Sequence, residues 1–197
     1  MNSYLIFIGS THGFIDDFLK QKEIIELTKP EFVLCEDLEN IQLDSKEKFE
    51  KIIQNRKISN MTSFNEVEKL INLCYNENIK LIGIDFKNFG FNKNLQNKIK
   101  SQEEINKKEK LEINKTIRLR ERRHLDKILG YRKKTSRPII IILGSWHLRE
   151  NSFLRNKLKN YKLILPCDKK NNLLFKPSDD KNIKYLEIIS DDTKNKN

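Results

Sequence analysis

The sequence predicts an α/β fold, with a mostly parallel sheet that carries helices on both faces. Short and almost continuously apolar runs, such as Tyr4–Ile8 and Pro138–Leu143, are typical of strands buried on both sides. Between these runs lie longer segments whose apolar residues recur at helical spacing. At 197 residues and 37% hydrophobic content, the chain can build one substantial core. We expect one domain over residues 1–190 and a polar, disordered tail at 191–197.

The first half of the chain alternates strands with helices. Its apolar runs are short and end at polar residues or glycine, whereas its helical segments show an apolar face and the first of them stops before Pro30. In chain order we expect a strand at Tyr4–Ile8, a helix at Phe14–Leu27, a strand at Glu31–Cys35, helices at Ser45–Lys57 and Ser63–Asn76, and a strand at Lys80–Ile84.

The second half contains a long helical crossover between the third and fourth strands. A patchy apolar stripe predicts a helix from about Leu95 to Leu129, after a turn-rich stretch. Its section Lys100–Lys110 is nearly all polar, so we expect it to be solvated, to project or to break the helix. There follow, in order, an expected strand at Pro138–Leu143, a helix at Leu148–Leu158, a strand at Lys162–Leu165 and an edge strand at Ile183–Ile189.

The charge of the chain bears on which kind of partner it binds. The net charge of +11 allows a nucleic-acid partner, but lysines are spread over the whole chain without interleaved aromatic residues. The densest basic block is Arg118, Arg120, Arg122, Arg123, Arg132, Lys133, Lys134 and Arg137. We place nucleic acid behind a small-molecule or peptide substrate as the expected partner.

The three cysteines are distant from one another and form no CxxC pair, which favours a reducing compartment over a disulfide framework or a zinc ribbon. Cys35 and Cys74 lie in apolar surroundings and are expected in the core. With no apolar run near the roughly 20 residues of a membrane span and no signal-peptide pattern, we expect a cytoplasmic protein without a membrane segment.

A repeated GSxH pattern is the most informative local feature. Gly9-Ser10-Thr11-His12 follows the first strand, and Gly144-Ser145-Trp146-His147 follows the fourth. Glu36 closes the second strand and Asp85 the third. Because ligands of open α/β sheets bind outside the carboxyl ends of the strands, we expect these side chains to converge in one site. Histidines and carboxylates suit a metal site or acid–base chemistry.

Each residue also has a purely structural interpretation. A single histidine or carboxylate at such a turn is more often a helix cap or a surface residue, and only the joint occurrence favours a site. We expect Ser10 and Ser145 to cap helices or to bind an anion. His124 is expected to be solvated or to pack. Trp146 either lines the pocket or, as we expect, fills the interface between helix and sheet.

These motifs resemble the TraB/Tiki superfamily, which also contains erythromycin esterases and ChaN-like haem-binding proteins. The two GxxH motifs match Gly9–His12 and Gly144–His147, and Glu36 matches the family glutamate. Gly83-Ile84-Asp85 resembles the GxD of the third strand. Glu121-Arg122-Arg123 resembles the ERD element, although Arg123 replaces its aspartate, and the membrane-spanning tail of some members is absent.

The resemblance implies a hydrolase, either a metal-dependent peptidase or an esterase. On this basis His12, Glu36 and His147 would hold a divalent ion (Zn, Mn or Fe) or would activate water directly. Arg122 would face a developing oxyanion, and Asp85 would join the metal ligands or orient a histidine. Gly9, Ser10, Gly144 and Ser145 would line the ligand site. The alternative is a non-catalytic protein that binds a metal, haem or an anion, as ChaN-like members do.

Overall fold

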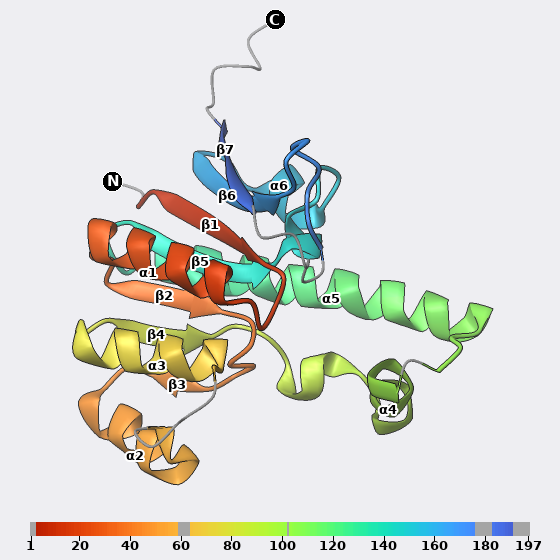
Figure 1. The fold of residues 1–197 in the computed structure, drawn as a ribbon, viewed down its shortest axis with the longest axis horizontal. Helices are drawn as coiled ribbons and strands as arrows, with labels where there is room; N and C mark the ends of the chain where they lie inside the picture. The colour runs from red at the N-terminus through yellow and green to blue at the C-terminus, as the bar shows by residue number, and fades with distance from the viewer. Residues whose placement is uncertain (1–2, 59–63, 102, 176–182, 191–197) are drawn as a thin grey trace, which may run out of the picture.

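The computed structural model confirms the α/β class (Figure 1) and describes residues 3–58, 64–101, 103–175 and 183–190. Its strands form one sheet in the order β3-β4-β2-β5-β1-β6-β7. Five neighbouring strands are parallel: β1 (Leu5–Ser10), β2 (Phe32–Cys35), β4 (Lys80–Gly83), β5 (Ile139–Gly144) and β6 (Tyr161–Cys167). The antiparallel strands β3 (Gln42–Leu43) and β7 (Lys184–Ser190) lie at the two edges.

All six predicted strands are present, with ends that differ by one or two residues. β3 was not predicted, because two residues are too few to show an alternating pattern. The predicted tail at 191–197 lies outside the described residues. No helix in the described ranges is both long enough and apolar enough to cross a bilayer.

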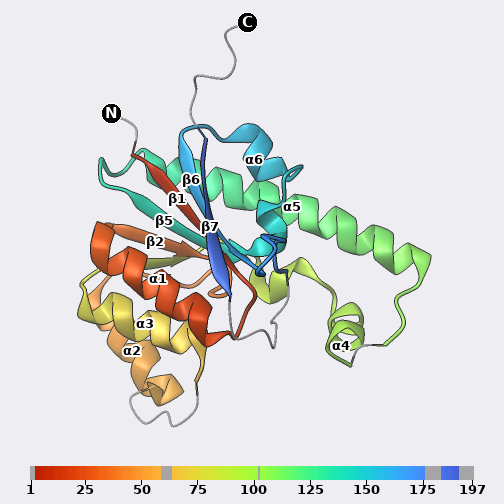
Figure 2. The ribbon, with the colours of Figure 1, turned by 45° about the horizontal axis from the view of Figure 1, so that its top comes forward.

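Helices cover both faces of the sheet, as Figures 1 and 2 show. α1 (Ile15–Thr28) and α3 (Glu66–Asn76) lie on one face, and α2 (Lys46–Arg56) packs beside α3. α5 (Lys107–Arg132) and α6 (Phe153–Lys157) lie on the other. The helix expected at Leu148–Leu158 is shorter in the structure: Leu148 ends the 3-10 turn η3 (Ser145–Leu148), and the helix α6, capped by the Ser152 side chain, follows at Phe153–Lys157.

Two apolar clusters pack against the two faces of the sheet. Ile6 and Ile8 of β1 belong to the cluster shared with α1 and α3, whereas Leu5 and Phe7 belong to the one shared with Ile128 of α5. Successive side chains of a strand point to opposite faces, so a strand that is covered on both sides must be apolar throughout. This double burial explains the unbroken apolar runs of the sequence.

The predicted crossover helix is broken in two. α4 (Lys93–Ser101) ends within the polar section, and α5 begins at Asn106, whose side chain forms a capping box with Glu109. α4 and residues 107–117 of α5, here called the arm, project away from the sheet (Figures 1 and 2). An ion pair of 2.8 Å between Lys98 Nζ and Glu109 Oε1 joins the two helices of the arm.

Candidate functional site

The predicted residues meet at the carboxyl edge of the parallel strands. β1, β2, β4 and β5 all end there, and a pocket of about 690 Å³ opens above them. Its polar side chains come mainly from the ends of these strands, while its apolar walls come from the arm and from loops. The residues that line the pocket include Ser10, His12, Glu36, Asp37, Glu66, Phe89, Phe91, Ile99, Ile117, Arg120, Gly144, Ser145, Trp146, His147 and Phe175.

Glu36 is the centre of the site. Its side chain is buried, and its Oε1 accepts a hydrogen bond of 2.6 Å from the Gly144 backbone N–H. The same oxygen lies 3.2 Å from His12 Nε2, and Oε2 lies 3.5 Å from His147 Nε2. Burial disfavours the charged form, but His147, His12 and Arg120 outweigh it and hold the pKa of Glu36 below its usual range. One carboxylate therefore connects the two GSxH turns.

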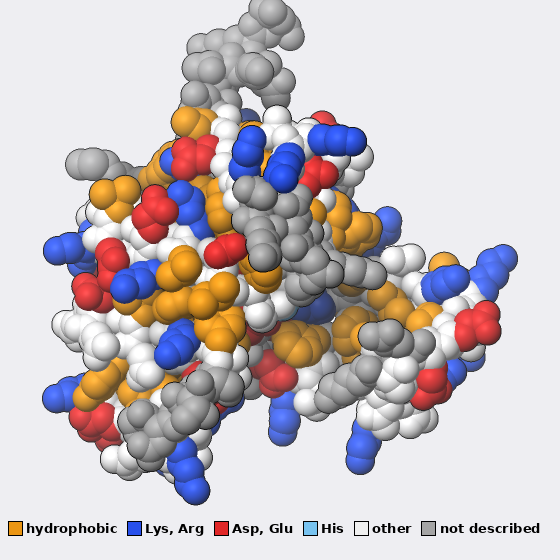
Figure 3. All heavy atoms as spheres, in the orientation of Figure 1, with side chains coloured by type: hydrophobic (Ala, Val, Ile, Leu, Met, Phe, Trp, Pro, Cys, Tyr) orange, Lys and Arg blue, Asp and Glu red, His pale blue; other side chains and the backbone are white. Residues whose placement is uncertain are grey.

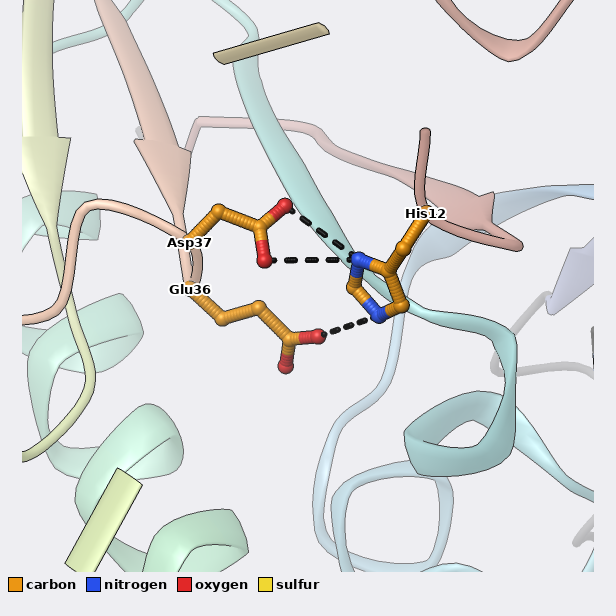
Figure 4. A group of neighbouring side chains, drawn as sticks. All are labelled: His12, Glu36 and Asp37. Atoms are coloured by element: carbon orange, nitrogen blue, oxygen red, sulfur yellow. Dashed lines mark hydrogen bonds and ion pairs between the residues drawn. The ribbon is translucent and has the colours of Figure 1, made fainter. Parts of the chain in front are cut away.

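His12 faces two carboxylates with its two ring nitrogens, as Figure 4 shows, and it is one of the residues that line the pocket. Its Nδ1 lies 3.3 Å from Asp37 Oδ1, while its Nε2 makes the contact with Glu36, and its side chain is 46% exposed. Partial burial acts against the charged ring, but hydrogen bonds to Asp37 and Glu36 raise the pKa of His12 to about 11. His12 is therefore an imidazolium at neutral pH, in contact with water and with any molecule in the pocket.

The backbone of the His12 turn has an unusual conformation, which hydrogen bonds to Glu66, Ser10 and Asp17 stabilise. His12 has φ = 64° and Gly13 has φ = 77°, a left-handed conformation that a histidine adopts only when its surroundings impose it. Glu66 of α3 accepts a hydrogen bond of 2.8 Å from the Gly13 N–H, and Ser10 Oγ accepts one of 2.9 Å from the His12 N–H. Asp17 of α1 accepts one of 2.6 Å from the Thr11 N–H. Two buried helix carboxylates thus shape the first GSxH turn.

His147 is fixed from both sides. Its Nδ1 lies 3.4 Å from Glu121 Oε1 on α5, and its Nε2 faces Glu36. Glu121 is buried, receives Arg149 Nη1 at 2.7 Å and accepts a hydrogen bond from the Phe153 N–H. Despite the burial, His147 and Arg149 lower the pKa of Glu121. A carboxylate behind an imidazole is the arrangement that orients histidine bases in hydrolases.

A second charged cluster lies behind Glu36. Arg120 Nη2 is 2.6 Å from Asp85 Oδ2 and 3.6 Å from Glu36 Oε2, so its guanidinium links the two carboxylates. His124 Nε2 lies 3.2 Å from Asp85 Oδ2, and the ring is fully buried at 5.2 Å from that of His147. Burial lowers the pKa of His124, which opposes the effect of Asp85. Of the two expectations for His124, solvated or packed, the structure shows the packed one, and the ring belongs to the interior of the site.

Arg122 does not lie with the predicted site residues. Its side chain is exposed on α5, above the Phe153 ring at 5.8 Å from the ring centroid. Positions 120 and 122 of one helix point in opposite directions, since each residue adds about 100° of rotation. Arg120 is the arginine that lines the pocket. Its inward position also divides the basic block of the sequence, which is therefore not a single solvent-facing surface.

The glycines of the two motifs serve close packing. Neither Gly9 nor Gly144 has a positive φ, so their backbone conformation alone does not require glycine. A Cβ on Gly144 would lie 2.6 Å from His12 Nε2 and 2.9 Å from Glu36 Oε1, and one on Gly9 would lie 2.8 Å from Ser145 Oγ. Ser145 Oγ donates to the Ser10 carbonyl at 3.2 Å, so both motif serines hold the turns together and cap no helix.

The four predicted metal ligands do not form one group. Among the described residues, ligand atoms within 4.8 Å of one another occur as His12, Glu36 and Asp37, and as Glu36, Asp85 and His124. Arg120 pairs with both carboxylates of the second group, whereas all three members of the first group line the pocket, so the first group is the better candidate for a divalent cation. Both ring nitrogens of His12 and His147 face carboxylates, so a haem iron would have to replace one of these contacts to bind either imidazole.

Three residues of this site, all on α5, were not predicted as site residues from the sequence. Arg120, Glu121 and His124 lie on α5 between Ile117 and Ile128, on the helix face that the apolar stripe marks. That interrupted stripe was the available signal, because polar residues in an inward-facing series must be paired or functional. Trp146, expected in the helix–sheet interface, instead lines the pocket and is 49% exposed.

Compared with known proteins, the chain matches no family model, no curated protein and no solved structure. The resemblance to the TraB/Tiki superfamily thus stays a prediction from short motifs, and the function must be argued from the site itself.

Proposed function

We propose that this protein is a hydrolase of ester or peptide bonds. The observation that carries the proposal is the geometry of Glu36, a buried carboxylate whose two oxygens face the imidazoles of His12 and His147 at the floor of a pocket. Buried charges are costly unless they are paired, and here the pairing partners are the two histidines that line the pocket. Such an arrangement suits proton transfer to and from a bound molecule.

The residues have separable roles in this reaction. His147, oriented by Glu121 at Nδ1, would accept a proton at Nε2 from the water that attacks the carbonyl carbon. Arg120 would stabilise the negative charge on the carbonyl oxygen. His12, charged at neutral pH, would donate its proton to the leaving oxygen or nitrogen as the bond to carbon breaks. The products are a carboxylic acid and an alcohol or amine.

A divalent cation is compatible with this scheme. His12, Glu36 and Asp37 would hold it, and it would supply Lewis-acid polarisation of the carbonyl group. His12 would have to release its proton to bind the ion, so uptake of the ion would increase with pH. His147 and Arg120 would keep their roles, since neither belongs to this ligand group.

Hydrolysis is tested with chromogenic esters and short peptides, each with chelator and with added Zn²⁺, Mn²⁺ or Fe²⁺. We expect His147→Gln to lower kcat/KM at least 100-fold, the usual contribution of a general base. Arg155→Gln is the control, because Arg155 lies on α6 and does not line the pocket. If the wild-type protein binds such molecules without turnover, the non-catalytic binding alternative holds in place of hydrolysis.

A further inference from the structure

We infer that the pocket takes an amphipathic substrate, in which an apolar acyl group is joined to the bond that is cleaved. This inference rests on the proposed function for the cleaved bond, but its basis is separate: the walls of the pocket differ in kind from its floor. The floor carries charged groups. The walls are built of aromatic and aliphatic side chains from three parts of the chain: Phe64 before α3, Trp146 and Phe175 on the C-terminal side, and Phe89, Phe91, Ile99 and Ile117.

The arm supplies one of these walls. Ile99 of α4 and Ile117 of α5 face the pocket together with Phe89 and Phe91, which lie in and just after the 3-10 turn η2 (Lys87–Gly90). In Figure 3, hydrophobic side chains gather in the hollow between the body of the molecule and the projecting arm. An apolar stripe on a helix marks the side that packs against other apolar groups, and large apolar side chains gathered around one exposed hollow are unusual on a protein surface. Apolar residues on the inner side of the arm therefore indicate that something apolar is bound there.

Within the described part of the chain, several of these apolar side chains stay partly exposed to solvent. Ile99 is 44% exposed, and Trp146 and Phe175, which form an edge-to-face pair with ring centroids 5.4 Å apart, are 49% and 40% exposed. Leaving three large apolar groups in contact with water around one cavity is unfavourable, and a bound apolar group would remove that cost.

Arg120 marks the boundary between floor and wall. Its guanidinium pairs with Asp85 and lies 5.1 Å from the centroid of the Phe89 ring. A carbonyl oxygen bound at Arg120 would thus place the acyl chain attached to the same carbon against Phe89 and the arm. The pocket orients its substrate by this contrast, with the reacting group toward Glu36 and the apolar group toward Ile99 and Ile117.

The experiment measures binding without any bond cleavage. Butanol, hexanol and octanol are titrated, and the fluorescence of Trp146, the single tryptophan of the chain, reports occupancy. We expect a blue shift and an affinity that tightens about two- to fourfold for each added methylene, as transfer of a methylene out of water requires. A parallel series of p-nitrophenyl esters with the same chain lengths should show kcat/KM rising in the same order.

Two matched variants locate the apolar group. Ile99→Asn should weaken octanol binding at least threefold and leave butanol binding almost unchanged. Leu111→Asn should change neither, since Leu111 is an apolar residue of the same arm, 64% exposed, that does not line the pocket. Affinities independent of chain length, or equal effects of the two variants, would overturn the inference. Binding that depends on chain length, without cleavage of esters or of the short peptides named above, would refute the hydrolase and retain the apolar site. Cleavage without that dependence on chain length would retain the hydrolase and refute the apolar site.

Discussion

At the scale of single residues, Arg120 and Arg122 of α5 allow a direct test of the site, because they lie two positions apart and point in different directions. Arg120 pairs with buried Asp85, whereas Arg122 is exposed. Removing one partner of a buried ion pair leaves an uncompensated charge, so Arg120→Gln should lower the free energy of unfolding by about 3 kcal/mol and kcat/KM by at least tenfold. Arg122→Gln should change stability by less than about 0.5 kcal/mol. Urea unfolding and ester hydrolysis measure both. Equal effects would contradict the assignment of Arg120.

Gly144 is expected to matter for chemistry more than for stability. Its φ of −53° is open to alanine, but the new Cβ would meet His12 Nε2 and Glu36 Oε1. In Gly144→Ala, the half-exposed imidazole of His12 should move away from Glu36. We expect a lower pKa for His12 by NMR titration and a large loss of activity. An unchanged His12 titration would show that the close approach at Gly144 is not required.

The pH dependence of stability should show whether the folded protein keeps His12 protonated. Its pKa is raised from 6.5 to about 11, so its ion pairs stabilise the folded state fully below pH 6.5. From there to about pH 11 the unfolded chain releases the proton while the folded chain keeps it, and the contribution is lost. The difference in Tm between the wild type and His12→Asn, measured in chelator, should therefore shrink from pH 6 to pH 10.5. A difference that grows with pH would contradict this sign.

Sequence patterns identified the strand-end residues of the site and missed those on the helix. His12, Glu36, Asp85 and His147 follow strands that are easy to recognise, and parallel strands bring their carboxyl ends to one edge. Residues of α5 depend on the rotation of a 26-residue helix whose apolar stripe is interrupted by the site residues themselves. The ERD-like motif therefore led to Arg122, two positions from the arginine that the helix turns inward.

At the scale of elements, α5 should be two regions of different local stability. Residues 107–115 are mostly exposed, whereas Glu121, His124 and Ile128 are buried against the sheet and α6. Backbone hydrogen bonds with little tertiary cover open at low free energy. We expect amide protons of residues 111–115 to exchange at least tenfold faster than those of residues 121–128. Uniform protection along α5 would mean that the arm is covered in solution.

Gly130 offers a complementary test near the other end of α5. Nothing lies within 4 Å of a Cβ built on this residue, and it is exposed within the helix. Gly130→Ala should therefore stabilise the protein by about 0.5–1 kcal/mol, measured by thermal unfolding, with no change in activity. Destabilisation would show that α5 ends before this position.

Elements differed in how well the sequence predicted them. Strands that are buried on both faces appear in the sequence as unbroken apolar runs, and all of these strands were predicted. The break between α4 and α5 was foreseen only as one of three outcomes for the polar section, because a capping box at Asn106 and a solvated helix look alike in composition. The helix expected at Leu148–Leu158 begins only at Phe153, since the apolar spacing does not show that Leu148 belongs to the separate turn η3.

At the scale of the whole molecule, the class of fold followed from the sequence but the order of the strands did not. Alternating strands and helices indicate a parallel sheet without telling which strands are neighbours. In the structure β5 lies between β1 and β2, with Ile139 opposite both Leu5 and Phe32. That placement brings His147 beside Glu36 and His12, a proximity set by topology and invisible to motif spacing.

The central position of β5 has a consequence for how the chain is made. Until residue 144 has been synthesised, β1 and β2 cannot become neighbours of their final partner, and each has an open hydrogen-bonding edge. A growing chain of about 138 residues therefore contains an unfinished sheet whose unpaired strand edges favour aggregation. The arm lies at the surface between the segment that contains β1, β2 and β4 and the segment that contains β5. The chain could therefore be cut in the arm to give two fragments. Mixing them would let β5 insert between its neighbours and restore the pocket, and recovery of activity would time the completion of the fold.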